Sequence, residues 1–333
     1  MKIIKTTFCI YFLLFFLNTN GQPSNDLSKP KFIYASEALG YLEAQQQSLS
    51  RIKREFPQLI QQCQIAEMRF NSVFGTASSR IESYLSNYFG KKKYEEIRIK
   101  MTNEVTIAIK NQILNEKIVL EYISEIENRA KGNIKSPILE TLLSFQFSEK
   151  PELEFLSGFT KVYKTSNHPK AKNTDWQIRV PMSWKAIEGN RPNIIQKFVS
   201  DNGSGLQMML LLVKDIPVPN GSIISQEEIN NFFSEQEIKS IVPEDGNFIS
   251  YKKMNFDGFN GGMLEFEQEG KQLDMTNKVR MIQYMFIYKG KLYSLQTMVL
   301  SSDSKTDLSD SMQKYFTLFQ LVANSIVVND QYK

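Results

Sequence analysis

The chain has 333 residues, enough for two domains of ordinary size. Hydrophobic residues make up 41% of it and aromatic residues 12%, so the chain can bury a core without disulfide support. The formal net charge is only +4 and neither half of the chain is strongly basic, which argues against the dense cationic surface that nucleic-acid binding requires. We therefore expect no nucleic-acid partner.

The first residues have the layout of a secretory signal peptide. Two lysines precede an unbroken apolar run, Phe8–Leu17, and small residues follow at Thr19 and Gly21. This run is too short for a membrane-spanning helix, which needs about 20 apolar residues. We expect residues 1–21 to be removed on export to the periplasm or beyond, leaving Gln22 as the new N-terminus and no transmembrane segment.

Cysteine usage is consistent with a bacterial periplasm. Cys9 lies inside the signal peptide and leaves with it, so the mature chain keeps only Cys63 and forms no internal disulfide. Cys63 falls on an apolar seam, where we expect a buried structural thiol.

Residues 35–146 are expected to form an all-helical domain. Apolar side chains recur every seven residues in two complementary series, and Pro57 interrupts the pattern, which predicts a break near Phe56. The series are Leu42, Leu49, Phe56, Cys63 and Phe70, and Ile52, Leu59, Ala66 and Val73.

Further helices follow in the same region. A break is expected at Gly75, a helix C-cap at Gly90, one long helix from about Lys92 to Ala130, and a short helix over 137–145. The domain is a bundle or a long antiparallel helical hairpin. The apolar seam either packs against the helix over 97–123 or pairs with another subunit, which leaves the oligomeric state open.

Residues 147–174 are rich in Pro, Lys, Asn and Ser and are interpreted as a linker. Beyond them the apolar period changes to that of strands, with Ser225 opening a helix through a capping box. The expected strands are 176–180, 194–199, 206–213, 248–256, 262–269, 279–288 and a strand that ends near Leu300, and the expected last element is a helix over 307–326.

Four sequence features of residues 175–328 occur in a characteristic order. They are a strand running into Val-Pro-Met-Ser-Trp-Lys, a long apolar strand followed by a Gln/Glu-rich helix, strands that turn at Gly258–Gly262 and end in Gly-Lys-Leu-Tyr-Ser-Leu, and a last helix closing in Phe-Gln-Leu-Val-Ala-Asn-Ser-Ile. The region resembles the PsbP-like family, which includes bacterial envelope proteins of the DcrB type. The resemblance implies that residues 175–330 form an α/β/α sandwich with an antiparallel sheet, within an α+β chain, and that the role is one of assembly or binding without catalysis.

Catalytic and cofactor motifs are absent from the sequence. His168 is the only histidine, so a zinc site with two histidines cannot form within one chain, and no nucleophile-elbow, phosphate-loop or dinucleotide-binding motif is present. We expect no enzyme activity, no cofactor and no resident metal.

One basic cluster is a candidate ligand site. His168, Lys170 and Lys172 precede the sheet, and Arg191 lies in a turn after its first strands, so the four side chains could converge on an anionic ligand or partner. The alternative is that these four residues belong to a solvent-exposed linker and a β-turn and bind no ligand. Glu265, Glu267 and Glu269 alternate along one strand, so their carboxylates share one face. Together with Asp274 they either bind calcium or form a plain solvent face.

These observations favour an exported, non-catalytic binding or assembly module of the cell envelope, with a protein partner. One alternative is a periplasmic protein that binds a small ligand or lipid between the sheet and its helices, in a pocket lined by Met208, Met209, Met281 and Met285. A further alternative is a hydrolase that uses carboxylates alone.

Overall fold

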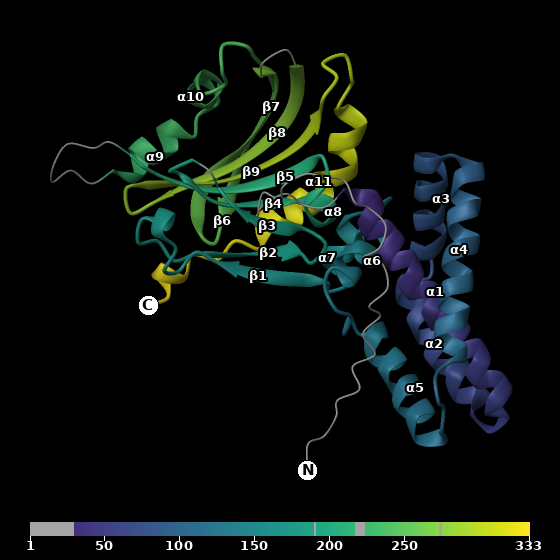
Figure 1. The fold of residues 1–333 in the computed structure, drawn as a ribbon. Coiled ribbons are helices and arrows are strands. Elements are labelled where there is room, and N and C mark those ends of the chain that lie inside the picture. The colour runs from purple at the N-terminus through teal and green to yellow at the C-terminus, as the bar shows by residue number, and fades with distance from the viewer. Residues whose placement is uncertain (1–29, 190, 217–223, 273–274) are drawn as a thin grey trace.

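The computed structural model describes residues 30–189, 191–216, 224–272 and 275–333. The predicted signal peptide, 1–21, lies outside this part of the chain. The first half of the described chain is helical and the second half contains the sheet (Figure 1), which confirms the predicted α+β class. Its helical elements are α1 (Lys31–Glu55), η1 (Pro57–Leu59), α2 (Ile60–Phe74), α3 (Ala77–Phe89), α4 (Lys91–Lys110), α5 (Glu116–Ala130), α6 (Ile138–Gln146) and α7 (Glu152–Leu156).

The helices begin and end where the backbone chemistry predicts. α1 ends immediately before Phe56 because Pro57 has no N–H to continue the helix. α2 stops before Gly75, and Gly90 separates α3 from α4 with a φ of 79°, which glycine adopts without strain.

The expectation of one helix from Lys92 to Ala130 is wrong. α4 ends at Lys110 and α5 begins after Asn115, whose side chain accepts the Ile118 amide at 3.0 Å as an N-cap. Ile113 lies between them and is 87% exposed, so it does not extend the apolar stripe.

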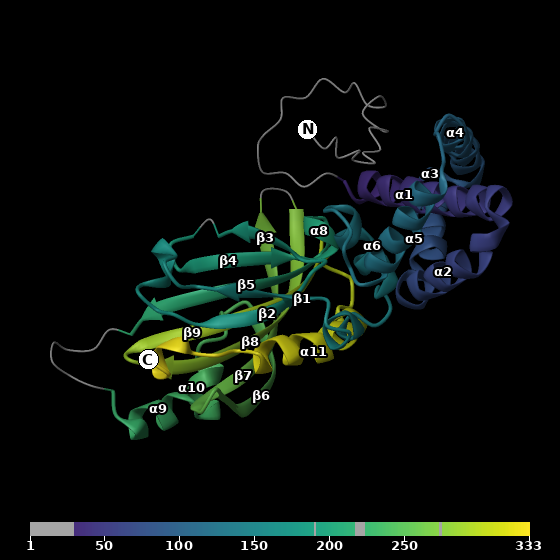
Figure 2. The same ribbon diagram turned by 90° about the horizontal axis from the view of Figure 1, so that it is seen from below.

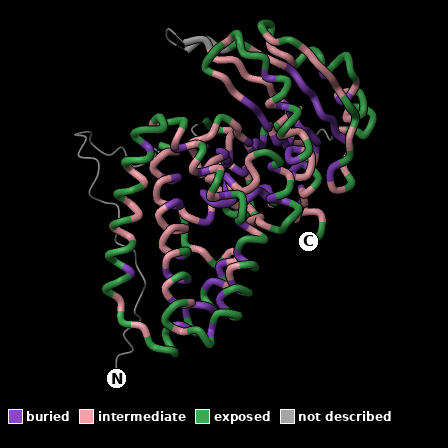
Figure 3. Tube along the Cα trace, turned by 90° about the vertical axis from the view of Figure 1, so that its right-hand side faces the viewer, coloured by how far each residue is buried: buried purple, intermediate pink, exposed green. Residues whose placement is uncertain are grey.

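The heptad seam packs within the chain. Its central side chains are buried in one cluster together with residues of α3, α5 and α6, and Cys63 is fully buried there. Burial raises the pKa of the Cys63 thiol, as expected for a structural cysteine. Figure 3 shows the buried faces of these helices turned inward and the exposed faces turned outward.

Regular structure replaces much of the expected linker. Residues 147–174 contain α7, strand β1 (Thr160–Lys164) and η2 (Pro169–Ala171), and β1 pairs antiparallel with β2 (Gln177–Pro181). The division into a helical and a sandwich domain stays a prediction.

A seven-stranded antiparallel sheet follows, in the order β3-β4-β5-β9-β8-β7-β6. The β8–β9 turn is at Lys289–Gly290, both with positive φ, and Ser225 caps α9 through the predicted capping box with Glu228. The remaining elements are β3 (Lys185–Glu188), β4 (Ile194–Val199), α8 (Ser200–Gly203), β5 (Gln207–Asp215), α9 (Gln226–Phe232), α10 (Glu235–Ser240), β6 (Gly246–Phe256), β7 (Phe259–Gln272), β8 (Met275–Tyr288), β9 (Lys291–Ser301), α11 (Ser309–Asn324) and η3 (Asn329–Gln331).

Helices pack on both faces of this sheet. On one face α11 and the β1–β2 hairpin enclose a core that includes Trp176, Tyr284 and Phe319. On the other face α9 and α10 cover β6–β8 through Phe233 and Ile238. Figure 2 shows α11 and α9–α10 beside the sheet and α6 between the sheet and the other helices.

The two tryptophans are core residues, as the sequence predicts. Trp176 is fully buried against Phe286 and Tyr293, and Trp184 packs edge-on against Phe319. Both are therefore anchors of the sheet core and not exposed stacking platforms.

Candidate functional site

The first half of the predicted basic cluster is assembled by a short turn. His168 precedes η2 and its Nδ1 accepts the Lys170 amide at 3.2 Å. The Lys170 ammonium lies 3.1 Å from a Glu188 carboxylate oxygen and also donates to the Gly189 carbonyl. The structure therefore brings His168–Lys170 and the β3–β4 turn together, as the sequence suggests.

The second half of the cluster is neutralised by an aspartate. Lys172 Nζ lies 2.7 Å from Asp215, and Lys291 lies 2.9 Å from the other oxygen of the same carboxylate. Hydrogen bonds from these lysines lower the pKa of Asp215 to about 2. Arg191 is exposed in the β3–β4 turn.

The sequence does not reveal these carboxylate partners. Because Lys170 and Lys172 are each paired, they offer less attraction to an anion than free cations would. Ligand binding by His168, Lys170, Lys172 and Arg191 stays a prediction.

The acidic strand face is paired as well. Glu265 lies 2.8 Å from Arg280 Nε, and Glu267 lies 2.8 Å from Lys278 Nζ, so basic side chains of β8 occupy these carboxylates. Across the described ranges, no group of three or more His, Cys, Asp or Glu side chains is placed to hold a metal ion. Two of the three glutamates are therefore paired with basic side chains, and Asp274, the other residue of the calcium alternative, lies outside the described residues, so that alternative stays untested.

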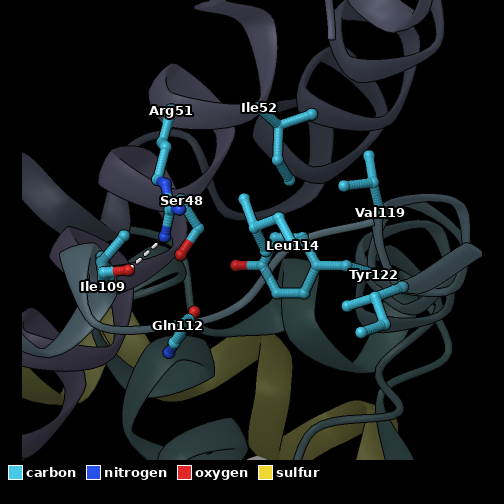
Figure 4. Close-up of a pocket in the computed structure, with 9 residues that line it drawn as sticks. Ser48, Arg51, Ile52, Ile109, Gln112, Leu114, Val119 and Tyr122 are labelled. Atoms are coloured by element: carbon cyan, nitrogen blue, oxygen red, sulfur yellow. Dashed lines mark hydrogen bonds between the residues drawn. The ribbon is translucent and has the colours of Figure 1, made fainter. Parts of the chain in front are cut away.

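A small pocket lies inside the helical region, between α1 and the α4–α5 connection (Figure 4). Arg51 donates to the Ile109 carbonyl there. Its volume of about 20 Å³ is close to that of one water molecule, so it is too small for an organic ligand.

A much larger cleft lies where the helices meet the sheet region. We call it the junction cleft; its volume is about 600 Å³, within the range of ligand sites in proteins. It is lined by the ends of α2, α5 and α6, the α7–β1 turn and the residue after β2. The lining residues are Ser72, Val73, Ala130, Lys131, Gly132, Asn133, Gln146, Phe147, Ser157, Gly158, Phe159 and Met182.

Aromatic side chains form the apolar part of this cleft. The rings of Phe147 and Phe159 have centroids 6.3 Å apart, and Phe74 packs against Phe159 from the core at 6.0 Å. Gly132 has a φ of +87°, and a Cβ at this position would lie 3.1 Å from the Phe159 ring. The backbone angle therefore favours glycine here, and any larger side chain would also have to displace the Phe159 ring slightly.

Two buried hydrogen bonds between Glu154 and Ser183, which we call the polar latch, stabilise the chain next to the cleft. The carboxylate of Glu154 accepts the Ser183 amide at 2.8 Å and the Ser183 hydroxyl at 2.6 Å. Burial raises the pKa of Glu154 to about 7, although the Ser183 bonds and the Lys161 charge oppose the shift. Lys161 Nζ donates to the Trp184 carbonyl at 2.5 Å, so the turn that carries Met182 is held on both sides.

Neither the junction cleft nor this latch is predicted by the sequence. The one local indication was an acidic residue between Leu153 and Phe155, which is unusual in an apolar segment. The partner Ser183 is 29 residues away, so no sequence period could connect the two.

Searches for related proteins found no matching family model and no similar curated protein. Similar solved structures include the cyanobacterial PsbP of Synechocystis (16% identity, 51% of this chain and 94% of that chain, TM-score 0.31) and LpqN of Mycobacterium tuberculosis, involved in cell envelope biogenesis (12%, 54% and 96%, 0.32). Another is the Ran-binding protein Mog1p of Saccharomyces cerevisiae (8%, 52% and 97%, 0.32).

At TM-scores near 0.3 these similarities do not indicate a function. They include a PsbP, the family that residues 175–328 resemble, but no family model supports the DcrB type. Among the helices that the structure describes, none has the length and apolar character to cross a membrane.

Proposed function

We propose that the chain is a non-catalytic binding module of the bacterial cell envelope and that it binds a partner protein at the junction cleft. The observation that carries this proposal is the cleft itself, about 600 Å³ in volume and lined from both the helical and the sheet parts of the chain. Its apolar rings and polar rim are the composition of a recognition site.

A partner protein fits this cleft better than a buried small ligand does. The rim residues Ser157 and Gly158 are exposed, and the neighbouring Leu156 is 61% exposed, so apolar contact surface continues beyond the cleft. The expected small-ligand pocket has less support, because Met209 and Met285 are fully buried in packed cores on opposite faces of the sheet.

Site-specific photocrosslinking in the envelope tests the partner. A photoreactive residue at Ser72, at the end of α2, and, separately, at Ser157, in the α7–β1 turn, probes two elements that line the cleft, and one at Glu227 on α9 serves as the control. We expect the same partner to be captured from both lining positions and not from Glu227. Capture of nothing, or equal capture at the control position, would overturn the proposal.

Export is tested by cell fractionation. With residues 1–21 present, the protein should be found outside the cytoplasm with Gln22 at its N-terminus, and without them it should stay inside. Recovery of the precursor from the cytoplasm alone would refute the envelope assignment.

A further inference from the structure

Strand β1 has an unpaired edge directly beside the junction cleft. It pairs with β2 alone, in a two-stranded sheet separate from the seven-stranded one. Ser157, Gly158 and Phe159 line the cleft, and β1 begins with the next residue, Thr160. Figure 1 shows β1 at the margin of the sheet part, with no described helix or strand directly below it. A partner chain that enters the cleft can therefore continue along this edge.

The hydrogen bonds of the hairpin decide which backbone groups of β1 point outward. The Met182 amide donates to the Phe159 carbonyl before β1, and the Thr165 amide donates to the Trp176 carbonyl after it. Because bonded and non-bonded pairs alternate along an antiparallel ladder, the odd-numbered residues of β1 bond to β2. The even-numbered residues lie between these pairs, so their N–H and C=O groups point away from β2.

The far edge of β2 confirms this alternation. Gln177 exchanges backbone hydrogen bonds of 2.8 and 3.0 Å with Val327, and the Arg179 amide also donates on that side. These two residues lie opposite Lys164 and Val162 of β1. Lys164 and Val162 therefore offer their backbone donors and acceptors on the opposite edge, and in the described chain neither amide has a backbone acceptor outside the hairpin.

The side chains of β1 divide between the core and the surface. Tyr163 packs its ring against Phe198 at 5.3 Å, and Lys161 donates to the Trp184 carbonyl. Val162 lies on the other side of the strand and is 54% exposed. An exposed β-branched residue beside an unpaired edge gives an added strand an apolar cross-strand contact.

The charge on this exposed side of the hairpin is positive. Lys164 and Arg179 are both exposed, and neither forms an ion pair with a carboxylate that the structure describes. Asp175, whose charge interacts with Lys164 at longer range, is already paired with Lys333 at 2.6 Å. Arg179 donates to the Thr160 hydroxyl at 2.7 Å. An edge with this charge disfavours a basic strand and favours an acidic one.

We propose that the partner protein adds an extended acidic segment to the free edge of β1 as an antiparallel strand. The inference rests on the proposed binding function and adds the chemistry that the partner must present. An apolar residue of the segment lies opposite Val162. Acidic residues two positions before and after it lie opposite Lys164 and Thr160, the second beside Arg179. Lys131, the one charged residue among the described residues that line the cleft, is positive as well.

A matched set of three capped peptides tests the charge preference on the full-length mature protein. The peptides are acetyl-Thr-Glu-Thr-Val-Thr-Glu-Thr-amide and its versions with Gln or Lys in place of both Glu residues. Binding is followed by the backbone amide resonances of Val162 and Lys164. We expect the Glu peptide to bind about tenfold more tightly than the Lys peptide, with the Gln peptide between them, and high salt should reduce this difference.

Two N-methylated forms of the Glu peptide test the backbone hydrogen bonds. In an antiparallel strand whose valine lies opposite Val162, the valine N–H points at β1 and the N–H of the preceding threonine points away. Methylation of the valine nitrogen should therefore weaken binding about tenfold, whereas methylation of that threonine nitrogen should change it little.

Variants of the chain locate the effect on β1. Lys164→Glu should reverse the preference, so that the Lys peptide binds more tightly than the Glu peptide. Lys253→Glu changes an exposed charge on β6, at the far edge of the other sheet, and should leave the preference unchanged. Val162→Pro removes one outward N–H without removing a bond to β2 and should weaken binding, whereas Val162→Thr keeps that N–H and should bind like wild type.

Each other outcome overturns the inference in a recognisable way. Equal binding of the three peptides, or a preference that Lys164→Glu does not reverse, refutes the acidic segment. Equal effects of the two methylations refute the added strand. If no peptide shifts the resonances of Val162 and Lys164, the edge of β1 is not a binding surface, and the crosslinking at Ser72 and Ser157 decides the proposed function separately.

Discussion

Glu154 makes the stability of this protein depend on pH in a specific way. Its carboxyl group is buried and its pKa is about 7 in the folded chain, against an ordinary value of 4.5. Below 4.5 both the folded and the unfolded chain hold the proton. Between 4.5 and 7 the folded chain keeps the proton more tightly, so the free energy of unfolding falls as the pH rises.

The size of this effect follows from the two values. A tenfold difference in proton affinity corresponds to about 1.4 kcal/mol. The difference between 4.5 and about 7 therefore corresponds to roughly 3 kcal/mol of stability, present below pH 4.5 and lost by the time the pH has passed 7.

The variant Glu154→Gln removes this titration and keeps an oxygen that accepts the Ser183 amide. Urea unfolding of wild type and variant between pH 4.5 and 8 measures the effect, since titrations common to both proteins cancel in the difference. We expect the variant to gain roughly 3 kcal/mol relative to wild type across this range. Glu149→Gln, which removes an exposed carboxylate nearby, is the control and should give no such gain. A constant difference between wild type and Glu154→Gln at every pH would refute the reasoning.

Three further predictions concern stability and reactivity. Gly132→Ala and Gly158→Ala both place a side chain at positive φ, which costs about 1 kcal/mol of stability each. Only the new methyl group at 132 also contacts the Phe159 ring, so thermal unfolding should show a larger loss of stability for Gly132→Ala. Equal losses of stability would refute that contact. Cys63 is fully buried, so an aromatic disulfide reagent should modify it only as fast as the protein opens, and immediate modification of the folded protein would contradict its position. Ser225→Ala should cost about 1 kcal/mol in urea unfolding because α9 loses its capping box, and an unchanged midpoint would show that α9 does not unfold with the rest.

Local chemistry could be predicted from the sequence because it depends on neighbouring residues. Pro57 cannot continue a helix, Gly90 adopts a backbone angle that other residues avoid, and Ser225 caps the helix that directly follows it. The alternation of apolar residues likewise predicted most strands of the sheet and the burial of Trp176. The α4–α5 boundary was missed because apolar residues continue through the loop, where Ile113 turned out to be exposed.

The candidate site depends on contacts between distant parts of the chain, and only the tertiary structure decided it. Lys172 was expected to face an anionic ligand or solvent, and folding places Asp215, 43 residues later, against it. Glu154 and Ser183 form a buried latch that no periodic pattern connects, and the junction cleft exists because three helices end at one place. A sequence specifies backbone preferences residue by residue, whereas burial, pairing and the direction of a helix end depend on what packs beside them. The sequence by itself therefore determined the α+β class, most of its elements and an expectation of export, and the tertiary structure determined where the junction cleft lies and which charges are paired.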